Sequence, residues 1–228
     1  MYRKKLGVVL YCGREDCVFS KKIKKFIKRY SNKFYYLESN KIGEKVPRKF
    51  YRYKYDYIFC FRSFYIITKK LLKKVRKAPI NFHPSPPEFR GAGGINYTLY
   101  KRLNFFGSTA HLMSEKIDYG KILDVRKFKI NNKESIEKIL NKTYKISTKQ
   151  IYFIINELLK NQNSLSMLIK KNKHMKWSRK FNTIKDLNKF YEINIKVSKS
   201  EFLKKIRSTN TLKFKPFITL HGHKFLLE

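Results

Sequence analysis

Residues 80–94 read INFHPSPPEFRGAGG, and this stretch marks where one strand of the fold stops. The apolar run Ile80–His83 predicts a short strand. Prolines follow at Pro84, Pro86 and Pro87, and proline has no amide N–H to donate to a sheet. Three glycines then interrupt the chain before a helix can begin. The stretch therefore predicts a strand that ends at His83 and is followed directly by a loop.

The segments before this strand alternate between strand and helix patterns. Leu6–Tyr11 is apolar and predicts a buried strand that turns at Cys12 and Gly13, whereas residues 21–30 carry apolar side chains at helical spacing. Further strands are expected at Phe34–Leu37 and Tyr55–Phe61, and the pattern is typical of an α/β fold with a parallel sheet.

The segments after the glycines continue the alternation. We expect a helix at Ile95–Leu103 and two strands at Ser108–Met113 and Ile122–Ile130. A capping box at residues 131–134 then predicts the start of a long helix, whose apolar positions run from Ile136 to Leu158. This part of the chain would complete the sheet and cover one of its faces.

The remaining segments are less regular. Residues 40–54 are polar and predict a loop, Ile66–Val75 predicts a helix, and the Lys-rich residues 160–176 predict a linker. The capping-box spacing recurs at residues 183–186 and 198–201, which predicts two short helices.

Strand character returns at Pro216–Leu227, close to the end of the chain. In the middle of this segment, residues 221–223 read His-Gly-His. We interpret them as a surface turn and not as a metal site, because no cysteine or acidic cluster accompanies the two histidines. No metal site is predicted anywhere in the sequence.

The charge of the chain is extreme. Lys and Arg together number 54 against 16 acidic residues, a formal net charge of +38, which favours nucleic acid or another acidic partner. Only 12 of the basic residues are arginine, the usual residue for bidentate phosphate recognition. The excess of lysine over arginine favours a surface covered by lysines that reflect a general bias in composition rather than a binding site. A nucleic-acid-binding role stays open as the alternative.

Composition also excludes several classes of protein. Hydrophobic residues make up 42% of the chain, so it can bury a core, and no apolar run is long enough to span a membrane. The apolar run Leu6–Cys12 lacks the small-residue cleavage site of a signal peptide. Three cysteines, Cys12, Cys17 and Cys60, form neither a disulfide framework nor a zinc motif. We expect reduced thiols in a cytoplasmic protein.

Polar groups with catalytic chemistry follow the strand at residues 80–83. Asn81 and His83 are two residues apart, so both side chains project from the same face of that strand. Ligands of open α/β sheets bind at this carboxyl edge. Further along lie His111 and Asp118, and Gly120 turns the chain just after them. An amide, imidazoles and a carboxylate can stabilise an oxyanion and move a proton, as acyl transfer requires.

Four motifs carry a family resemblance: NFHPS at residues 81–85, FRG at 89–91, GSTAH at 107–111 and IDYGKI at 117–122. In this order and spacing they resemble the folate-dependent formyltransferase family, which includes glycinamide ribonucleotide transformylase, methionyl-tRNA formyltransferase and the sugar N-formyltransferases. The resemblance is strongest over residues 55–130.

The resemblance implies a domain organisation as well. It predicts a Rossmann-like catalytic domain with a mostly parallel sheet in residues 1–160. Residues 177–228 would form a small C-terminal extension, because this segment resembles the tail of the short members of the family.

The resemblance also implies an activity and a catalytic trio. The donor would be 10-formyltetrahydrofolate as co-substrate, and the acceptor a primary amine. Asn81 and protonated His83 would stabilise the oxyanion, and Asp118 would hold the charge state of His83 and help to move the amine's proton. Folate contacts are implied for Arg62, Ser63, Phe64, His111 and Asp118. Contacts with the acceptor are implied for Ser85, Arg90 and Gly91.

The acceptor is the open part of the prediction. A nucleotide-linked amino sugar is the first choice, because the short tail resembles that of the sugar enzymes. Methionyl-tRNA is second and glycinamide ribonucleotide third. Residues 86–88 read Pro-Pro-Glu where the family usually carries two leucines before its proline, in the loop that faces the acceptor. A homodimer is possible. The alternative function is a non-catalytic, basic nucleic-acid-binding protein on the same fold.

Overall fold

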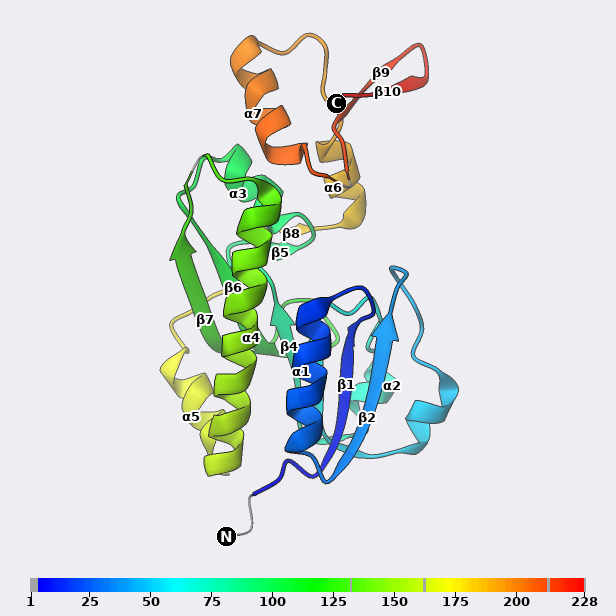
Figure 1. Ribbon diagram of the computed structural model, residues 1–228, viewed down its shortest axis with the longest axis vertical. Helices are drawn as coiled ribbons and strands as arrows, with labels where there is room; N and C mark the ends of the chain where they lie inside the picture. Colours follow the sequence, from blue (N-terminus) through cyan, green and yellow to red (C-terminus); the bar gives the residue numbers. More distant parts are fainter. Residues whose placement is uncertain (1–3, 132, 162, 213, 228) are drawn as a thin grey trace.

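The computed structural model describes residues 4–131, 133–161, 163–212 and 214–227. Its centre is a six-stranded sheet in the order β2-β1-β3-β4-β6-β7 (Figure 1). The four strands β2, β1, β3 and β4 are parallel, and β6 and β7 are antiparallel to their neighbours. The predicted α/β class with a mostly parallel sheet is therefore confirmed. The strands are β1 (Val8–Arg14), β2 (Lys33–Ser39), β3 (Tyr55–Phe61), β4 (Val75–His83), β6 (Phe105–Leu112) and β7 (Ile122–Lys129).

Strand β1 begins two residues later than predicted, at Val8, and continues to Arg14. The predicted turn at Cys12 and Gly13 is wrong, because both residues continue the strand and pair with β2. A Cβ at Gly13 would lie 2.1 Å from the Ser20 hydroxyl oxygen, so glycine is what lets the following helix pack this closely. Cys12 is buried beside Cys60 of β3, and the three cysteines are free thiols.

Helices cover both faces of the sheet. On one face α1 (Val18–Arg29) and α4 (Ile136–Lys160) lie side by side (Figure 1), and the Phe26 and Tyr152 rings meet at 4.1 Å between centroids. The other face carries the 3-10 helix Arg48–Arg52, inside a segment predicted as loop, and α2 (Lys69–Leu72). The helix predicted over residues 66–75 shrinks to α2 because Val75 already pairs with β3.

Two further predictions near α4 need correction. The capping box at residues 131–134 exists as a turn, but α4 begins at Ile136 and its N-cap is Ser135, whose hydroxyl accepts from the Lys138 backbone N–H. The predicted linker contains α5 (Ser164–Lys171), which packs against β7 and buries Leu168. Its apolar residues Leu165, Leu168 and Ile169 recur at helical spacing, but the run is short and ends in lysines.

Residues 177–212 and 214–227 are here called the tail. Most of the tail lies at one end of the molecule, while α5 lies at the other (Figure 1). The predicted helix starts are confirmed, with Thr183 and Ser198 as N-caps, and the His221–His223 segment is a surface turn as predicted. The tail contains β8 (Phe181–Asn182), α6 (Ile184–Phe190), α7 (Lys199–Thr209), β9 (Phe217–Leu220) and β10 (His223–Leu226).

The tail is joined to the body by direct contacts. Strand β8 pairs in parallel with β5 (Arg90–Gly91), and α7 packs on α3 (Gly94–Tyr100). The buried Asn96 amide donates a 2.7 Å hydrogen bond to the Ser208 carbonyl. The division into domains at 1–160 and 177–228 stays a prediction, and residues 1–3, 132, 213 and 228 of it lie outside the described residues. No helix in the described part of the chain is long and apolar enough to cross a membrane.

Candidate active site

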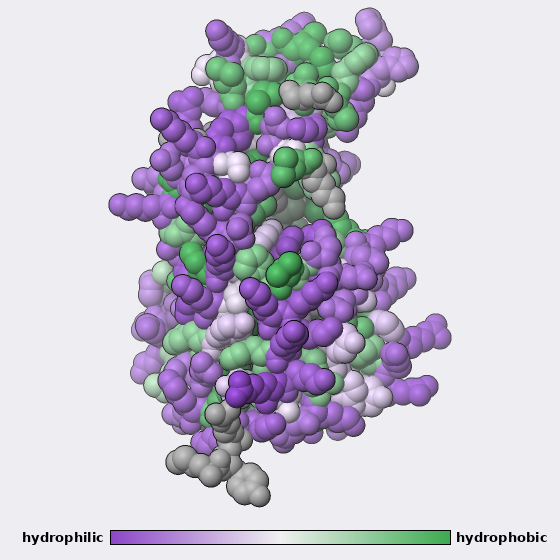
Figure 2. Space-filling view, viewed as in Figure 1, coloured by the Kyte–Doolittle hydropathy of each residue, from purple (hydrophilic) through white to green (hydrophobic). Residues whose placement is uncertain are grey.

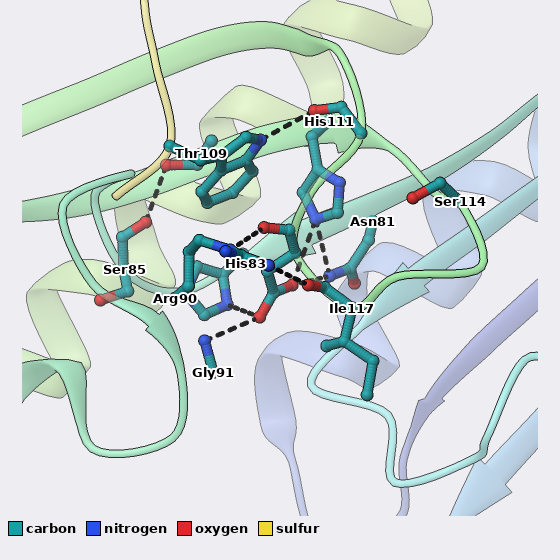
Figure 3. Close-up of polar contacts among 12 residues, drawn as sticks. Asn81, His83, Ser85, Arg90, Gly91, Thr109, His111, Ser114 and Ile117 are labelled. Carbon is teal, nitrogen blue, oxygen red and sulfur yellow. Dashed lines mark hydrogen bonds and ion pairs between the residues drawn. The ribbon is translucent and has the colours of Figure 1, made fainter. Parts of the chain in front are cut away.

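The carboxyl edge of the sheet brings the predicted polar residues together. His83 is the last residue of β4, and Asn81 precedes it on the same face of the strand. Strand β6 places His111 directly opposite Asn81 in the antiparallel register. Asp118 comes from the connection between β6 and β7. Figure 3 shows the labelled side chains of Asn81, His83 and His111 converging on one point.

The carboxylate of Asp118 is the centre of this cluster. Its Oδ1 accepts from Asn81 Nδ2 at 3.4 Å and lies 3.3 Å from His111 Nε2. Its Oδ2 lies 3.4 Å from His83 Nδ1 and accepts a 3.1 Å bond from the Gly91 backbone N–H. Asn81 Nδ2 also lies 3.1 Å from His111 Nε2. The structure therefore joins the predicted trio and adds His111 and Gly91 to it.

Asp118 is held in its ionised form. Only 6% of the residue is exposed, and burial by itself raises the pKa of a carboxyl group. The charge of His83, the hydrogen bond and charge of His111, and the Gly91 backbone N–H outweigh burial and hold the pKa of Asp118 well below its ordinary value. A buried carboxylate that stays charged is available as a fixed partner for a cation.

The two ring nitrogens of His83 have the hydrogen-bonding neighbours that suit an imidazolium, the protonated form of the ring. Its Nδ1 faces the Asp118 carboxylate, and its Nε2 lies 2.9 Å from the Phe89 carbonyl oxygen. Both neighbours can only accept hydrogen bonds, and only the protonated ring carries a hydrogen on each nitrogen. The geometry thus favours a buried, positively charged ring beside a buried carboxylate.

The backbone at Asp118 is unusual and is supported by Arg90. Asp118 has φ of 46°, in the left-handed region, which costs on the order of 1–3 kcal/mol and is common at functional sites. Arg90 is buried, and its guanidinium donates to the carbonyls of Asp118 (2.7 Å), Ile117 (3.2 Å) and Ser178 (3.3 Å). Arg90 is thus placed to hold the loop that carries Asp118.

A cavity of about 380 Å³ opens beside His83. Ser85 lines it, and its buried hydroxyl has no hydrogen-bond partner among the described residues. A buried hydroxyl without a partner is rare in proteins and is free to bind a ligand. The wall formed by the tail is mostly apolar. The tail residues that line the cavity are Leu187, Tyr191, Thr211, Leu212 and Phe214.

The predicted folate segment follows β3. Arg62 lines the same cavity, has φ of 54°, and lies 4.0 Å above the Tyr144 ring while donating to the Cys17 sulfur. The Ser63 hydroxyl accepts from a backbone N–H two residues later. The Phe64 backbone N–H donates to a buried serine, and the Arg14 guanidinium lies 4.3 Å from the Phe64 ring centre. These contacts fix the loop and leave Arg62 at the cavity.

Sequence reasoning missed Trp177. This residue lies at the start of the tail, and its ring centre is 5.0 Å from that of His111 and 6.0 Å from that of His83. Trp177 is the only tryptophan of the chain and stands in a polar, lysine-rich stretch. A lone large aromatic residue in such a stretch is the signal that it packs against another part of the fold.

No group of three His, Cys, Asp or Glu side chains in the described ranges has the arrangement of a metal site. The cluster around Asp118 offers an amide, two imidazoles and a carboxylate. Such a set can donate hydrogen bonds to a developing negative charge and can hold a proton.

Comparison with known proteins supplies the context for this geometry. A family model described as "Formyl transferase" matches residues 9–154, which include every member of the cluster. The chain belongs to the formyl transferase family. A relative, the methionyl-tRNA formyltransferase of Wigglesworthia glossinidia brevipalpis, is 28% identical over 149 residues, covering 65% of this chain and 47% of that protein. The chain thus spans about half the length of this formyl transferase.

Solved formyl transferases of similar length share the fold. A 4-N formyltransferase from Francisella tularensis is 20% identical, with a TM-score of 0.70 over 96% of both chains. An N-formyltransferase from Helicobacter canadensis, solved with folinic acid and dTDP-3-aminofucose, is 14% identical. It has a TM-score of 0.64 over 94% of this chain and 84% of its own. The likeness to these formyl transferases extends through the tail.

Proposed function

We propose that the protein is an N-formyltransferase that moves a formyl group from 10-formyltetrahydrofolate to a primary amine. The observation that carries this proposal is the contact of Asn81, His83 and Asp118 beside a cavity, in a member of the formyl transferase family. The trio combines an amide donor with a cation and its fixed counter-ion. Together these groups can stabilise the negative charge that develops in acyl transfer.

The proposed reaction forms one bond, breaks one bond and moves one proton. The acceptor nitrogen attacks the formyl carbon and forms the new C–N bond. The bond from that carbon to N10 of the donor breaks, and the proton lost by the amine ends on N10. Asn81 donates to the formyl oxygen while it carries negative charge. Asp118 holds His83 in place, and we assign it a part in passing on the amine's proton through water.

His83 acts mainly through its charge in this arrangement. Both of its ring nitrogens already face protein acceptors, the Phe89 carbonyl and the Asp118 carboxylate. A direct N–H contact from His83 to the substrate requires one of these two contacts to break. The buried positive charge acts on a nearby oxyanion without any such change, because the site is largely shielded from water.

The donor is supported by the family and by the loop after β3. The Helicobacter relative was solved with folinic acid, a formylated folate. Arg62 offers a cation at the cavity for a carboxylate or a polar ring edge. The folate contacts proposed for this chain are Arg62, Ser63, Phe64, His111 and Asp118.

The acceptor we favour is a nucleotide-linked amino sugar. The solved relatives that match this chain through its tail include sugar N-formyltransferases, and one holds a dTDP-linked amino sugar. The cavity beside His83 suits such a ligand, since the Ser85 hydroxyl is free and the cation Arg14 lines the wall. Ser85 and Gly91 are the proposed acceptor contacts, and we assign Arg90 a supporting role behind them.

The test is a turnover assay by mass spectrometry with purified protein and 10-formyltetrahydrofolate. The acceptors are a panel of amino-sugar nucleotides and, separately, charged initiator tRNA. We expect a formylated sugar nucleotide. Transfer to the tRNA alone would overturn the sugar acceptor. The absence of folate binding, measured by calorimetry with folinic acid, would overturn the reaction class.

Salt separates the enzyme from the alternative, a basic nucleic-acid-binding protein. Affinity that rests on 6–10 phosphate contacts falls by about 10³–10⁵ between low and moderate salt. We expect the rate of transfer to a sugar nucleotide to change far less over the same range. A nucleic acid bound with that steep dependence, together with no formyl transfer, would favour the alternative.

A homodimer is part of the proposal. The hairpin formed by β9 and β10 exposes apolar side chains, and large exposed apolar patches often mark association surfaces. The exposed residues are Leu220, Phe225 and Leu226. Light scattering after gel filtration measures the mass in solution, and a monomer at all concentrations would contradict this part.

A further inference from the structure

We propose that Trp177 is a positioning residue of the active site, which fixes the two imidazoles around Asp118 and shields them from water. The proposal rests on the proposed function, because it assigns Trp177 a part in that same reaction. Trp177 belongs to the tail, and along the chain it lies far from the loop that carries Asp118.

The rings meet edge to face. Trp177 and His111 are nearly perpendicular, at 88°, with 5.0 Å between ring centres. Trp177 and His83 are inclined at 63°, with 6.0 Å between centres. Aromatic rings prefer this arrangement because the positive edge of one meets the negative face of another. A single indole therefore restrains both imidazoles that contact the Asp118 carboxylate.

Trp177 is itself held at both ends. Its indole N–H donates a 2.8 Å bond to the Gly120 carbonyl, two residues after Asp118. The next residue, Ser178, donates its N–H to the Pro87 carbonyl and accepts from Arg90. The indole cannot turn away without breaking its bond to Gly120, and the backbone beside it is held by the bonds of Ser178 to Pro87 and Arg90.

The surroundings of Trp177 indicate a role at the site as well as in packing. Within the described residues, the ring pairs of Trp177 involve the two histidines and no Phe or Tyr. The imidazoles under it are almost fully buried. Exclusion of water strengthens the attraction between His83 and Asp118, which is the interaction that keeps the cation in place.

Kinetics with two substitutions test the positioning role. We expect Trp177→Ala to lower kcat by about ten- to a hundredfold, the cost of a small misplacement of catalytic groups, with little change in either KM. The pH dependence of kcat should move as well, because water then reaches the histidines. Trp177→Phe should restore most of the rate, since it keeps a ring there.

Unchanged kcat in Trp177→Ala would overturn the proposal. A loss of stability with an unmoved pH profile would also overturn it, because that is the result of a purely structural role. Where Trp177→Ala does not fold, Trp177→Leu takes its place. The absence of any transfer by the wild-type protein would instead be a failure of the proposed function.

Fluorescence gives a test that does not depend on turnover. The chain has one tryptophan, so its emission reports on Trp177 alone. A protonated imidazole in contact quenches indole emission, so His83→Asn combined with His111→Asn should raise it. The matched control is His174→Asn, an exposed histidine three residues away in sequence, which should leave emission unchanged. Equal emission in the double variant and the wild type would contradict the contact.

Discussion

The carboxyl edge of the sheet and the tail differ in what they bury. At the edge, the polar groups around Asp118 are partnered: Asp118 is 6% exposed and has four neighbours that donate to or attract it. In the tail, apolar groups are exposed, and Leu212 reaches 87%. Figure 2 shows hydrophobic side chains gathered at the tail end, on a face that is otherwise largely hydrophilic.

This difference separates two tasks. A buried, fully partnered cluster has one geometry, which suits a reaction whose charges must be stabilised at fixed positions. An exposed apolar surface gains stability when it is covered by a ligand or by a second chain. We infer that the sheet edge, together with Trp177, carries the chemistry and that the rest of the tail selects what is brought to it.

The largest expected effect comes from Asn81→Ala at the edge. Loss of one oxyanion donor typically lowers kcat by about 10²–10³. The matched control is Asn104→Ala, which removes an exposed amide just before β6 and should keep the wild-type rate. Steady-state kinetics at saturating folate and acceptor measure both. Near-normal kcat in Asn81→Ala would contradict a catalytic role for the edge of the sheet.

Asp118→Asn tests whether the edge depends on charge. Since the pKa of Asp118 is lower in the folded protein than in the unfolded chain, its ionisation stabilises the fold above the unfolded pKa, and this stabilisation is lost as pH falls toward the folded pKa. Breaking a buried pair costs about 3 kcal/mol or more at neutral pH. Urea unfolding should show this difference in the free energy of unfolding between the wild type and Asp118→Asn at neutral pH, and a smaller difference in acid. A difference that is independent of pH would contradict the assignment.

Arg90→Met tests the junction between the two regions. The substitution keeps a long, flexible side chain but removes the donors to three carbonyls, two of which belong to the catalytic loop at Ile117 and Asp118. We expect kcat to fall by about 10², because the carboxylate shifts. The control is Arg29→Met, on the exposed side of α1. A change in acceptor KM alone would instead make Arg90 a substrate contact.

Phe214→Ala tests the tail. Phe214 lines the cavity and is 59% exposed, so an acceptor can bury its ring. We expect the acceptor KM to rise by about tenfold, in the range of lost apolar contacts in a pocket, with kcat and folate affinity unchanged. Phe225→Ala, on β10 outside the cavity, should leave KM unaltered. Equal effects of the two substitutions would argue against selection by the cavity wall.

The smallest effect is expected from Ser85→Ala on stability. The Ser85 hydroxyl is buried without a partner among the described residues, so its removal breaks no hydrogen bond. The free energy of unfolding should stay the same or rise by up to about 1 kcal/mol, while the acceptor KM rises. Thermal unfolding and kinetics together measure this. A clear loss of stability would show that the hydroxyl serves the fold.

Much of the edge could be predicted from the sequence, because its signals are local. Tyr55–Phe61 is strand β3 as predicted, and the placement of Asn81 and His83 follows from the period of two in a strand. The helix expected over residues 66–75 failed because pairing of Val75 in the sheet outweighed the helical pattern. Propensity gives way to tertiary contacts of this kind.

The tail could be predicted only in its local features. The N-caps at Thr183 and Ser198 follow from spacing. The contacts that attach the tail do not, because β5 and β8 are two residues long and far apart in sequence. The position of Trp177 over the histidines depends on that pairing and on one bond to a carbonyl, and neither leaves a pattern in the sequence.

The most direct test of the separation between chemistry and selection is a single-turnover experiment. Protein loaded with 10-formyltetrahydrofolate is mixed with saturating acceptor, and the formylated product is followed by mass spectrometry for wild type, Asn81→Ala and Phe214→Ala. We predict the wild-type rate for Phe214→Ala and a rate lower by about 10² or more for Asn81→Ala. Transfer by Asn81→Ala at the wild-type rate would contradict the central claim, as would an equally large loss in Phe214→Ala.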